Sequence, residues 1–223
     1  MTTSGTFAFN LDLIDVFEEA YEMVGIEMRN GYDARTAKRS LDLLMKEWGN
    51  RGVNLWALEQ VVTPVAIGEQ SITLPVDTID VLDAVWRTGD GPGQFDRSMT
   101  RISVMEWSHM ANKTMDGQPS EYYINRLSPN QVMYIWPVPT DPGSLVYWKM
   151  RQMQDAGSYS NTVDIPSRFL PALTSGLAYY LAIKTPSAGE RLPIIQREYE
   201  RQFQYAYETD RERASLWLTP GCD

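Results

Sequence analysis

The sequence has one cysteine and one histidine among its 223 residues, and it has no long apolar run. A single thiol, that of Cys222, cannot form a disulfide within the chain. Zinc sites need several cysteine or histidine ligands, so these two residues exclude such a site. The longest apolar run covers the seven residues from Leu177 to Ile183, which is far too short to cross a bilayer. We therefore expect no zinc centre and no membrane span.

The scarcity of histidine also limits catalysis. A Ser-His-Asp or Cys-His arrangement would have to use His109, whose neighbours Trp107 and Met110 are bulky. A structural or surface role suits His109 better. The N-terminus lacks a basic segment followed by a long apolar one, so we expect no export signal.

Two other patterns resemble binding motifs only superficially. The run 89–93 is rich in glycine, but it lacks the Gly-Lys-Ser/Thr ending of a phosphate loop, and Pro92 removes an amide donor. A surface loop that reaches a neighbouring copy is the better interpretation. Asp77, Asp80 and Asp83 are spaced by three, without the alternate-position oxygens of a calcium loop, and indicate a solvated face. We predict no catalytic, cofactor-binding or metal-binding residue.

The net charge is −9, and residues 1–110, with 9 basic and 17 acidic side chains, account for most of it. An acidic surface repels phosphate, which argues against sequence-specific DNA binding. Such a surface can still line a path along which DNA slides without adhering. Seven tryptophans and twelve tyrosines favour a protein that works through interfaces, where these residue types are common.

Helical periodicity appears at both ends of the chain. Asn10 is the expected N-cap of a first helix, and Asp33 that of a second, which ends at Gly49 or Gly52. The predicted inward-facing residues of the two helices are Ile14, Phe17, Tyr21, Val24 and Met28, then Ala37, Leu41, Leu44, Met45 and Trp48. Two further helices are predicted from Pro166, where small residues indicate burial on most sides, and from Leu192.

The middle of the chain is rich in β-branched and aromatic residues separated by turn residues. Strands are predicted at residues 58–62, 71–74, 79–87, 121–126, 131–136 and 144–152. A short helix is predicted at 102–110, opening at Ser103 with Glu106 completing a capping box.

This order predicts an α+β fold, in which N- and C-terminal helix pairs form a four-helix bundle and an antiparallel β lobe is inserted between them. We expect an N-terminal arm and helical hairpin at 1–57, the β-rich lobe at 58–163, C-terminal helices at 164–213 and a tail at 214–223. In the tail, Leu216, Trp217 and Leu218 either fold back on the bundle or insert into a groove of a partner, since tryptophan is a common interface anchor.

Four stretches resemble the head-to-tail adaptor (tail tubular protein A-like) family of short-tailed bacteriophages. They are Leu43-Leu44-Met45-Lys46-Glu47-Trp48 with Gly52-Val53-Asn54-Leu55-Trp56, then Thr73-Leu74-Pro75 with Asp77, then Gly117-Gln118-Pro119-Ser120-Glu121-Tyr122-Tyr123 leading to Ile135-Trp136-Pro137-Val138-Pro139, and last Asp164-Ile165-Pro166-Ser167-Arg168-Phe169 leading to Gly176-Leu177-Ala178-Tyr179-Tyr180-Leu181-Ala182. Each motif is weak alone, but the four in order, over roughly residues 40–185, are fairly specific.

The resemblance implies a structural virion protein of the neck or tail, made in the host cytoplasm. It implies a ring of about twelve copies that joins the portal to the tail nozzle, often carries fibres, and extends the DNA channel without binding DNA specifically. C-terminal segments of the family tend to dock onto the portal, which matches Leu216, Trp217 and Leu218 as docking residues. No enzymatic activity and no cofactor are implied.

Two other function classes fit the sequence less well. A tail-associated cell-wall hydrolase would need a catalytic glutamate, for which Glu47 and Glu106 are the candidates. Both lie beside tryptophan in predicted helical segments, so packing explains them better. A generic oligomeric scaffold protein is the third possibility, and the neighbouring genes would discriminate it from an adaptor.

Overall fold

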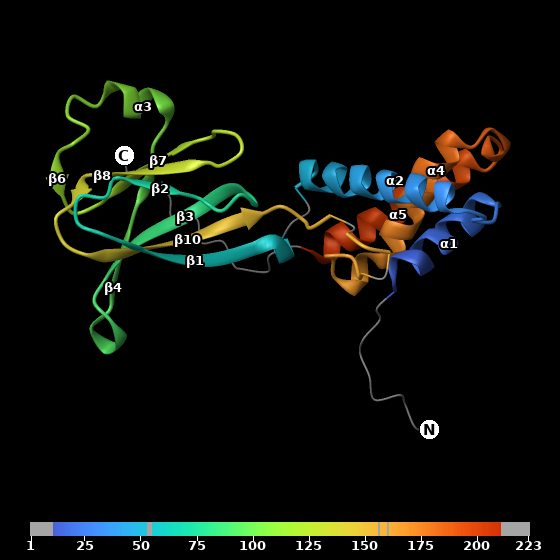
Figure 1. Cartoon of the computed structure of the whole chain (residues 1–223), viewed down its shortest axis with the longest axis horizontal. Helices are drawn as coiled ribbons and strands as arrows, with labels where there is room; N and C mark the ends of the chain where they lie inside the picture. Colours follow the sequence, from blue (N-terminus) through green and yellow to red (C-terminus); the bar gives the residue numbers. More distant parts are fainter. Residues whose placement is uncertain (1–10, 53–54, 156, 160, 211–223) are drawn as a thin grey trace, which may run out of the picture. The chain divides into compact units, whose positions relative to one another are not determined.

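The computed structural model describes residues 11–52, 55–155, 157–159 and 161–210 (Figure 1). It combines helices with several sheets, which confirms the predicted α+β class. The chain divides into two compact units. A helical unit comprises Met1–Trp56 with Met153–Asp223, and a β unit comprises Ala57–Gln152. We describe each unit by itself.

Four helices of the helical unit contribute to one hydrophobic core. They are α1 (Leu13–Val24), α2 (Gly31–Asn50), α4 (Leu170–Lys184) and α5 (Leu192–Thr209), and short 3-10 turns lie at η1 (Leu55–Ala57), η3 (Ser167–Phe169) and η4 (Pro186–Ala188). Trp48 is fully buried between the rings of Phe169 and Phe203, and its indole N–H donates to the Tyr199 hydroxyl at 3.0 Å. Burial of this large aromatic surface stabilises the unit.

The α4 helix lies in the middle of this core and is buried on most of its circumference, as its small residues predicted. A Cβ atom added at Gly176 would lie 2.8 Å from Tyr199 Cε2 and 3.0 Å from Leu44 Cδ2. The absence of a side chain at Gly176 therefore lets α4 approach both α5 and α2. The α1 helix packs mainly against α4.

Both predicted N-caps of the first two helices are wrong. The α1 helix begins after Asp12, whose backbone N–H donates to Asp15 Oδ2 at 3.3 Å, while Asn10 lies outside the described residues. The α2 helix is capped by Asn30, whose side-chain oxygen accepts from the backbone N–H groups of Tyr32 and Asp33. An asparagine satisfies two orphan amides here, which moves the start of the helix three residues earlier than predicted.

The inward-facing residues of the second helix are confirmed, because all five predicted side chains are buried. In the first helix Phe17, Tyr21 and Val24 are buried as predicted, but the rest of the predicted stripe differs. Leu13 and Val16 are buried, whereas Ile14 is exposed and Met28 lies beyond the helix end. The helix stops at Gly25, which adopts a φ of 89° that favours glycine.

The β unit contains two four-stranded sheets. The first has the order β1 (Leu58–Val65), β10 (Gly143–Arg151), β3 (Thr78–Thr88), β4 (Phe95–Ser98), and all of its pairs are antiparallel. The second has the order β2 (Ser71–Thr73), β8 (Val132–Trp136), β7 (Glu121–Asn125), β5 (Thr100–Arg101), with β5 parallel to β7. A two-residue pair joins β6 (Asp116–Gly117) to β9 (Val138–Pro139).

One core joins the two sheets of this unit. Trp86, Leu145 and Tyr147 contribute from the first sheet, and Tyr122 and Ile135 from the second. On the other face of the second sheet, the ring of Trp107 stacks on Tyr123 at 5.6 Å between centroids. That contact places α3 (Val104–His109) over the outer face of the second sheet.

All six predicted strands are confirmed, and so is the short helix α3. Its capping box is complete, since Ser103 Oγ accepts from the Glu106 N–H at 3.2 Å and Glu106 Oε2 accepts from the Ser103 N–H at 2.6 Å. Strand β4 was not predicted, because all four of its side chains are exposed and no apolar alternation marks it. Among the described residues, no helix is long and apolar enough to span a bilayer.

Candidate interaction surfaces

The predicted docking residues Leu216, Trp217 and Leu218 lie outside the described residues. The surfaces considered below therefore belong to residues 11–210.

The aspartates of β3 and the segment before it form contacts within the fold. Asp77 accepts two hydrogen bonds of 2.9 Å from Lys149 Nζ, and Glu59 lies 3.3 Å from the same atom. The Lys149 side chain is only 5% exposed. Burial lowers the pKa of Lys149, but the hydrogen bonds that its ammonium group donates to Asp77 and Glu59 outweigh this effect and raise the pKa overall. This group holds β1, β10 and the turn before β3 together.

The other two aspartates are also occupied. Asp80 bridges Arg101 and Arg126, at 2.9 Å from each, and the Asp83 carboxylate accepts from the Ala84 N–H at 2.9 Å. The interpretation of a merely solvated face is therefore wrong for Asp80. Within the described part of the chain, no cluster of three or more His, Cys, Asp or Glu residues is arranged to hold a metal ion.

The residues considered for catalysis have structural roles. Glu106 closes the capping box of α3, and its hydrogen bonds from Ser103 lower the pKa of the carboxyl. Glu47 forms an ion pair with Arg51 and accepts from the Tyr180 hydroxyl at 2.6 Å. Burial and that hydrogen bond raise the pKa of Tyr180 to about 12. His109 is the exposed last residue of α3.

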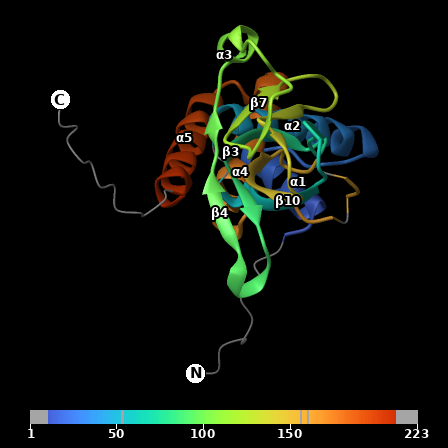
Figure 2. The same cartoon turned by 90° about the vertical axis from the view of Figure 1, so that its left-hand side faces the viewer.

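The β3–β4 hairpin extends away from the rest of the β unit (Figures 1 and 2). The glycine-rich run 89–93 forms its tip, with a 3-10 turn, η2, at Gly91–Gly93. Arg87 holds the two strands together through paired hydrogen bonds of 2.8 Å to Asp96, and these bonds lower the pKa of Asp96. Phe95, beside the tip, is 63% exposed. An exposed aromatic ring on an extended hairpin is suited to contact another molecule.

The open face of the first sheet is a second candidate surface. Trp148 is 45% exposed and lies opposite Gln60 and Asp83 in the sheet register. A hollow of about 200 Å³ beside it is lined by Asp83, Val146 and Asp96, among others. Val62, paired with Val146, is half exposed. This mixed apolar and acidic face was not identified from the sequence.

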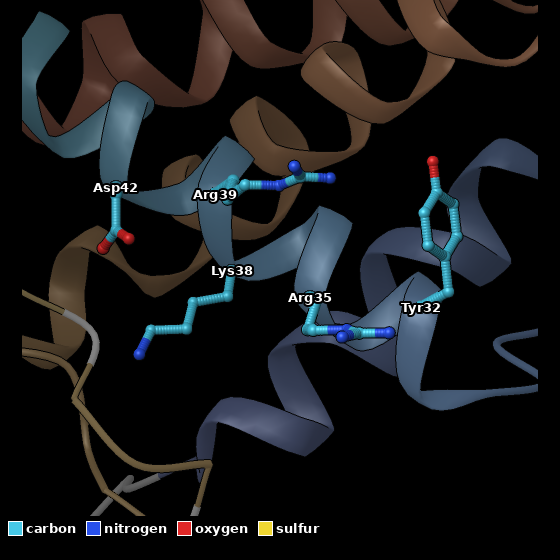
Figure 3. Close-up of a pocket in the computed structure, with 5 residues that line it drawn as sticks. All are labelled: Tyr32, Arg35, Lys38, Arg39 and Asp42. Atoms are coloured by element: carbon cyan, nitrogen blue, oxygen red, sulfur yellow. The ribbon is translucent and has the colours of Figure 1, made fainter.

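A third candidate surface lies on α2 and is basic. The described residues that line a hollow of about 470 Å³ here come from this helix, and they are Tyr32, Arg35, Lys38, Arg39 and Asp42. Figure 3 shows their side chains projecting from successive turns of the helix. A second hollow of about 570 Å³ shares Tyr32 and Arg39 and continues to the exposed Leu43. The first hollow, with Arg35, Lys38 and Arg39, is called the basic groove, and the second adjoins it at the two shared residues.

The cations of this groove form no ion pair with a carboxylate in the part of the chain that the structure describes. Arg35 donates to the Gly31 carbonyl, Arg39 to the Thr36 hydroxyl and Lys38 to the Gly157 carbonyl. These acceptors are neutral, and Asp42 is the single carboxylate among the described residues of the hollow, so this surface is positive in a protein of net charge −9. The sequence carried a signal for the three cations, namely the i, i+3, i+4 spacing that brings side chains to one helix face.

Comparison with known proteins gives one family. The model of the SU10 adaptor protein family matches residues 19–221. No curated protein matches the chain. The family is a phage head-to-tail adaptor family, so its members are structural components of the virion neck or tail rather than a class of enzymes. The match covers most of the chain and includes both units, and this chain therefore belongs to the SU10 adaptor protein family.

Proposed function

We propose that this protein forms a ring that joins the portal of the capsid to the tail nozzle and continues the DNA channel between them. The family match carries the proposal, because it runs through the helical unit and the β unit alike. In this proposal both units, and not one domain alone, therefore take part in the adaptor function. A ring of about twelve copies, in a phage with a short tail, is the arrangement that we propose.

The helical unit supplies the rigid body of each subunit in this proposal. We propose that its two helix pairs form a four-helix bundle with the β lobe inserted, and that the functional boundaries lie at 1–57, 58–163, 164–213 and 214–223. The core shared by α1, α2, α4 and α5 supports this arrangement. The exposed hairpin and the open sheet face of the β unit are then available to neighbouring copies, to the nozzle or to tail fibres.

The channel would carry DNA without retaining it. The protein has a net charge of −9, and acidic residues that face the lumen would repel the phosphates during packaging and ejection. Synthesis in the host cytoplasm precedes assembly in this scheme.

Portal docking through the C-terminal tail is the part of the proposal that is simplest to test. We propose that Leu216, Trp217 and Leu218 insert into a groove of the portal, as apolar anchors do in other interfaces. Deletion of residues 214–223 should leave a folded protein that no longer co-sediments with purified portal. A matched variant, Trp217→Ala, should weaken the complex in the same direction. Unchanged co-sedimentation of the deleted protein would disprove docking through the tail.

The ring itself is tested with the intact chain. Purified protein mixed with portal should give rings under the electron microscope, and particle necks imaged at side-chain resolution should contain this chain. Absence of the protein from the vertex of the finished virus would overturn the proposed function.

A further inference from the structure

Two oppositely charged surfaces lie on neighbouring helices of the helical unit. The α1 helix carries four carboxylates, Asp15, Glu18, Glu19 and Glu22, and no basic residue. All four are exposed. Their i, i+3, i+4, i+7 spacing places them on one helix face, which we call the acidic strip. The basic groove of α2, defined by Arg35, Lys38 and Arg39, carries the opposite charge.

The acidic strip has no cation of its own. Among the residues that the structure describes, no lysine or arginine pairs with Glu18, Glu19 or Glu22. In the same part of the chain, the three cations of the basic groove form no ion pair either. Each surface therefore leaves its charge available to another molecule, and the two together offer that molecule complementary charge.

The two surfaces also match in length. Asp15 to Glu22 and Arg35 to Asp42 each cover eight residues, and their first and last residues are about 10 Å apart along the helix at a rise of about 1.5 Å per residue. Exposed apolar side chains accompany both surfaces. Ile14 lies next to the acidic strip, Tyr32 lines the basic groove, and Leu43 lines the hollow that adjoins it. These side chains matter, because exposed ion pairs alone contribute little to affinity and mainly set orientation.

We propose that the acidic strip of one copy binds the basic groove of the next copy, and that this contact repeats around the ring. The inference rests on the proposed ring. Closed rings of identical subunits require heterologous contacts, in which two different patches of the same surface meet. The acidic strip and the basic groove share no residue, so one subunit can use both at once.

Charge reversal tests the contact. The variants Glu18→Lys/Glu19→Lys/Glu22→Lys (the strip variant) and Arg35→Glu/Lys38→Glu/Arg39→Glu (the groove variant) each make both surfaces of a subunit alike in charge, positive in the first and negative in the second. Each variant alone should lose ring formation on portal, or require about tenfold more protein for it. Rings of the wild type should weaken as salt is raised, since the Debye length falls to about 8 Å at physiological ionic strength and further above it.

An equimolar mixture of the two variants should form rings again. The unchanged groove of the first variant meets the unchanged strip of the second, and the two reversed surfaces also attract each other. The combined variant, which carries all six substitutions and so exchanges the charges of strip and groove in one chain, should likewise assemble. Glu69→Lys/Asp116→Lys/Asp141→Lys makes the same change of net charge as the strip variant at exposed positions of the β unit and should form rings as the wild type does.

The outcomes separate this contact from the ring itself. Wild-type protein that binds portal only as single copies would overturn the proposed function. Rings formed by either variant alone would overturn only the pairing of strip and groove. So would a mixture and a combined variant that stay unassembled although circular dichroism shows them folded. Wild-type assembly that stops at two copies would replace the head-to-tail contact by a symmetric one.

Discussion

At the scale of single residues, the ion pair of Lys149 with Asp77 allows a prediction about the free energy of unfolding. The Lys149 ammonium group is nearly buried and depends on Asp77, which contacts it with both oxygens at 2.9 Å. Asp77→Ala leaves this cation with Glu59 alone, and we expect a loss of about 2 kcal/mol in the free energy of unfolding. Lys149→Met leaves two carboxylates that water can reach, because Asp77 and Glu59 are 40% and 52% exposed. That change should cost less than about 1 kcal/mol.

Urea unfolding of the two variants and the wild type measures the difference. An equal loss of unfolding free energy in Asp77→Ala and Lys149→Met would contradict the prediction. It would mean that the lysine stem, or the ion pair as a whole, determines the stability, and not the charge left without a partner. The sequence did not reveal this group. The spacing of Asp77, Asp80 and Asp83 indicated a solvated face. This was wrong for Asp77 and Asp80, whose partners Lys149, Arg101 and Arg126 lie 20 or more residues away along the chain.

At the scale of elements, the packing of α4 depends on one glycine. A side chain at Gly176 would meet Tyr199 at 2.8 Å and Leu44 at 3.0 Å, and both of these residues are buried. Gly176→Val should therefore destabilise the protein by about 2 kcal/mol or more through overpacking, even though glycine is itself a poor helix former. A Cβ atom added at the half-buried Gly49 of α2 would meet no atom within 4 Å, so this glycine supplies the control. Gly49→Ala should stabilise by about 0.5–1 kcal/mol. Thermal unfolding that ranks the two in the opposite order would refute the close approach of α4.

Elements differed in how well the sequence predicted them. Trp48 and its stripe were placed correctly, since a 3.6-residue period with large apolar side chains leaves one face to bury. The N-caps of α1 and α2 were predicted wrongly, because Asn10, Asp12, Asn30 and Asp33 are all residue types that can cap a helix. Only packing selects among them. Strand β4 has no buried side chain, so periodicity could not mark it. Its pairing with β3 is what forms it.

For the molecule as a whole, the family followed from the order of four weak motifs, whereas the binding surfaces did not. The basic groove of α2 could not be predicted from the charge of residues 1–110, because the surplus of acidic side chains there outweighs the three cations on one helix. The exposed charged face of a helix can be identified only once its buried residues define which side of the helix faces the core. Portal docking through Leu216, Trp217 and Leu218 stays a prediction.

The division into two units predicts that the β unit can fold alone. Residues 57–152 form one continuous segment with their own core, in which Trp86 is fully buried. The helical unit is built from two segments, so it depends on the β segment as a tether. A fragment of residues 57–152 should unfold cooperatively in urea, with a near-ultraviolet dichroism signal from packed aromatic rings. Trp86→Ala in the same fragment should abolish the transition, because removing a buried tryptophan costs about 3–5 kcal/mol, which is comparable to the stability of a domain this small. A fragment without a cooperative transition would mean that the β core requires the helical unit to fold.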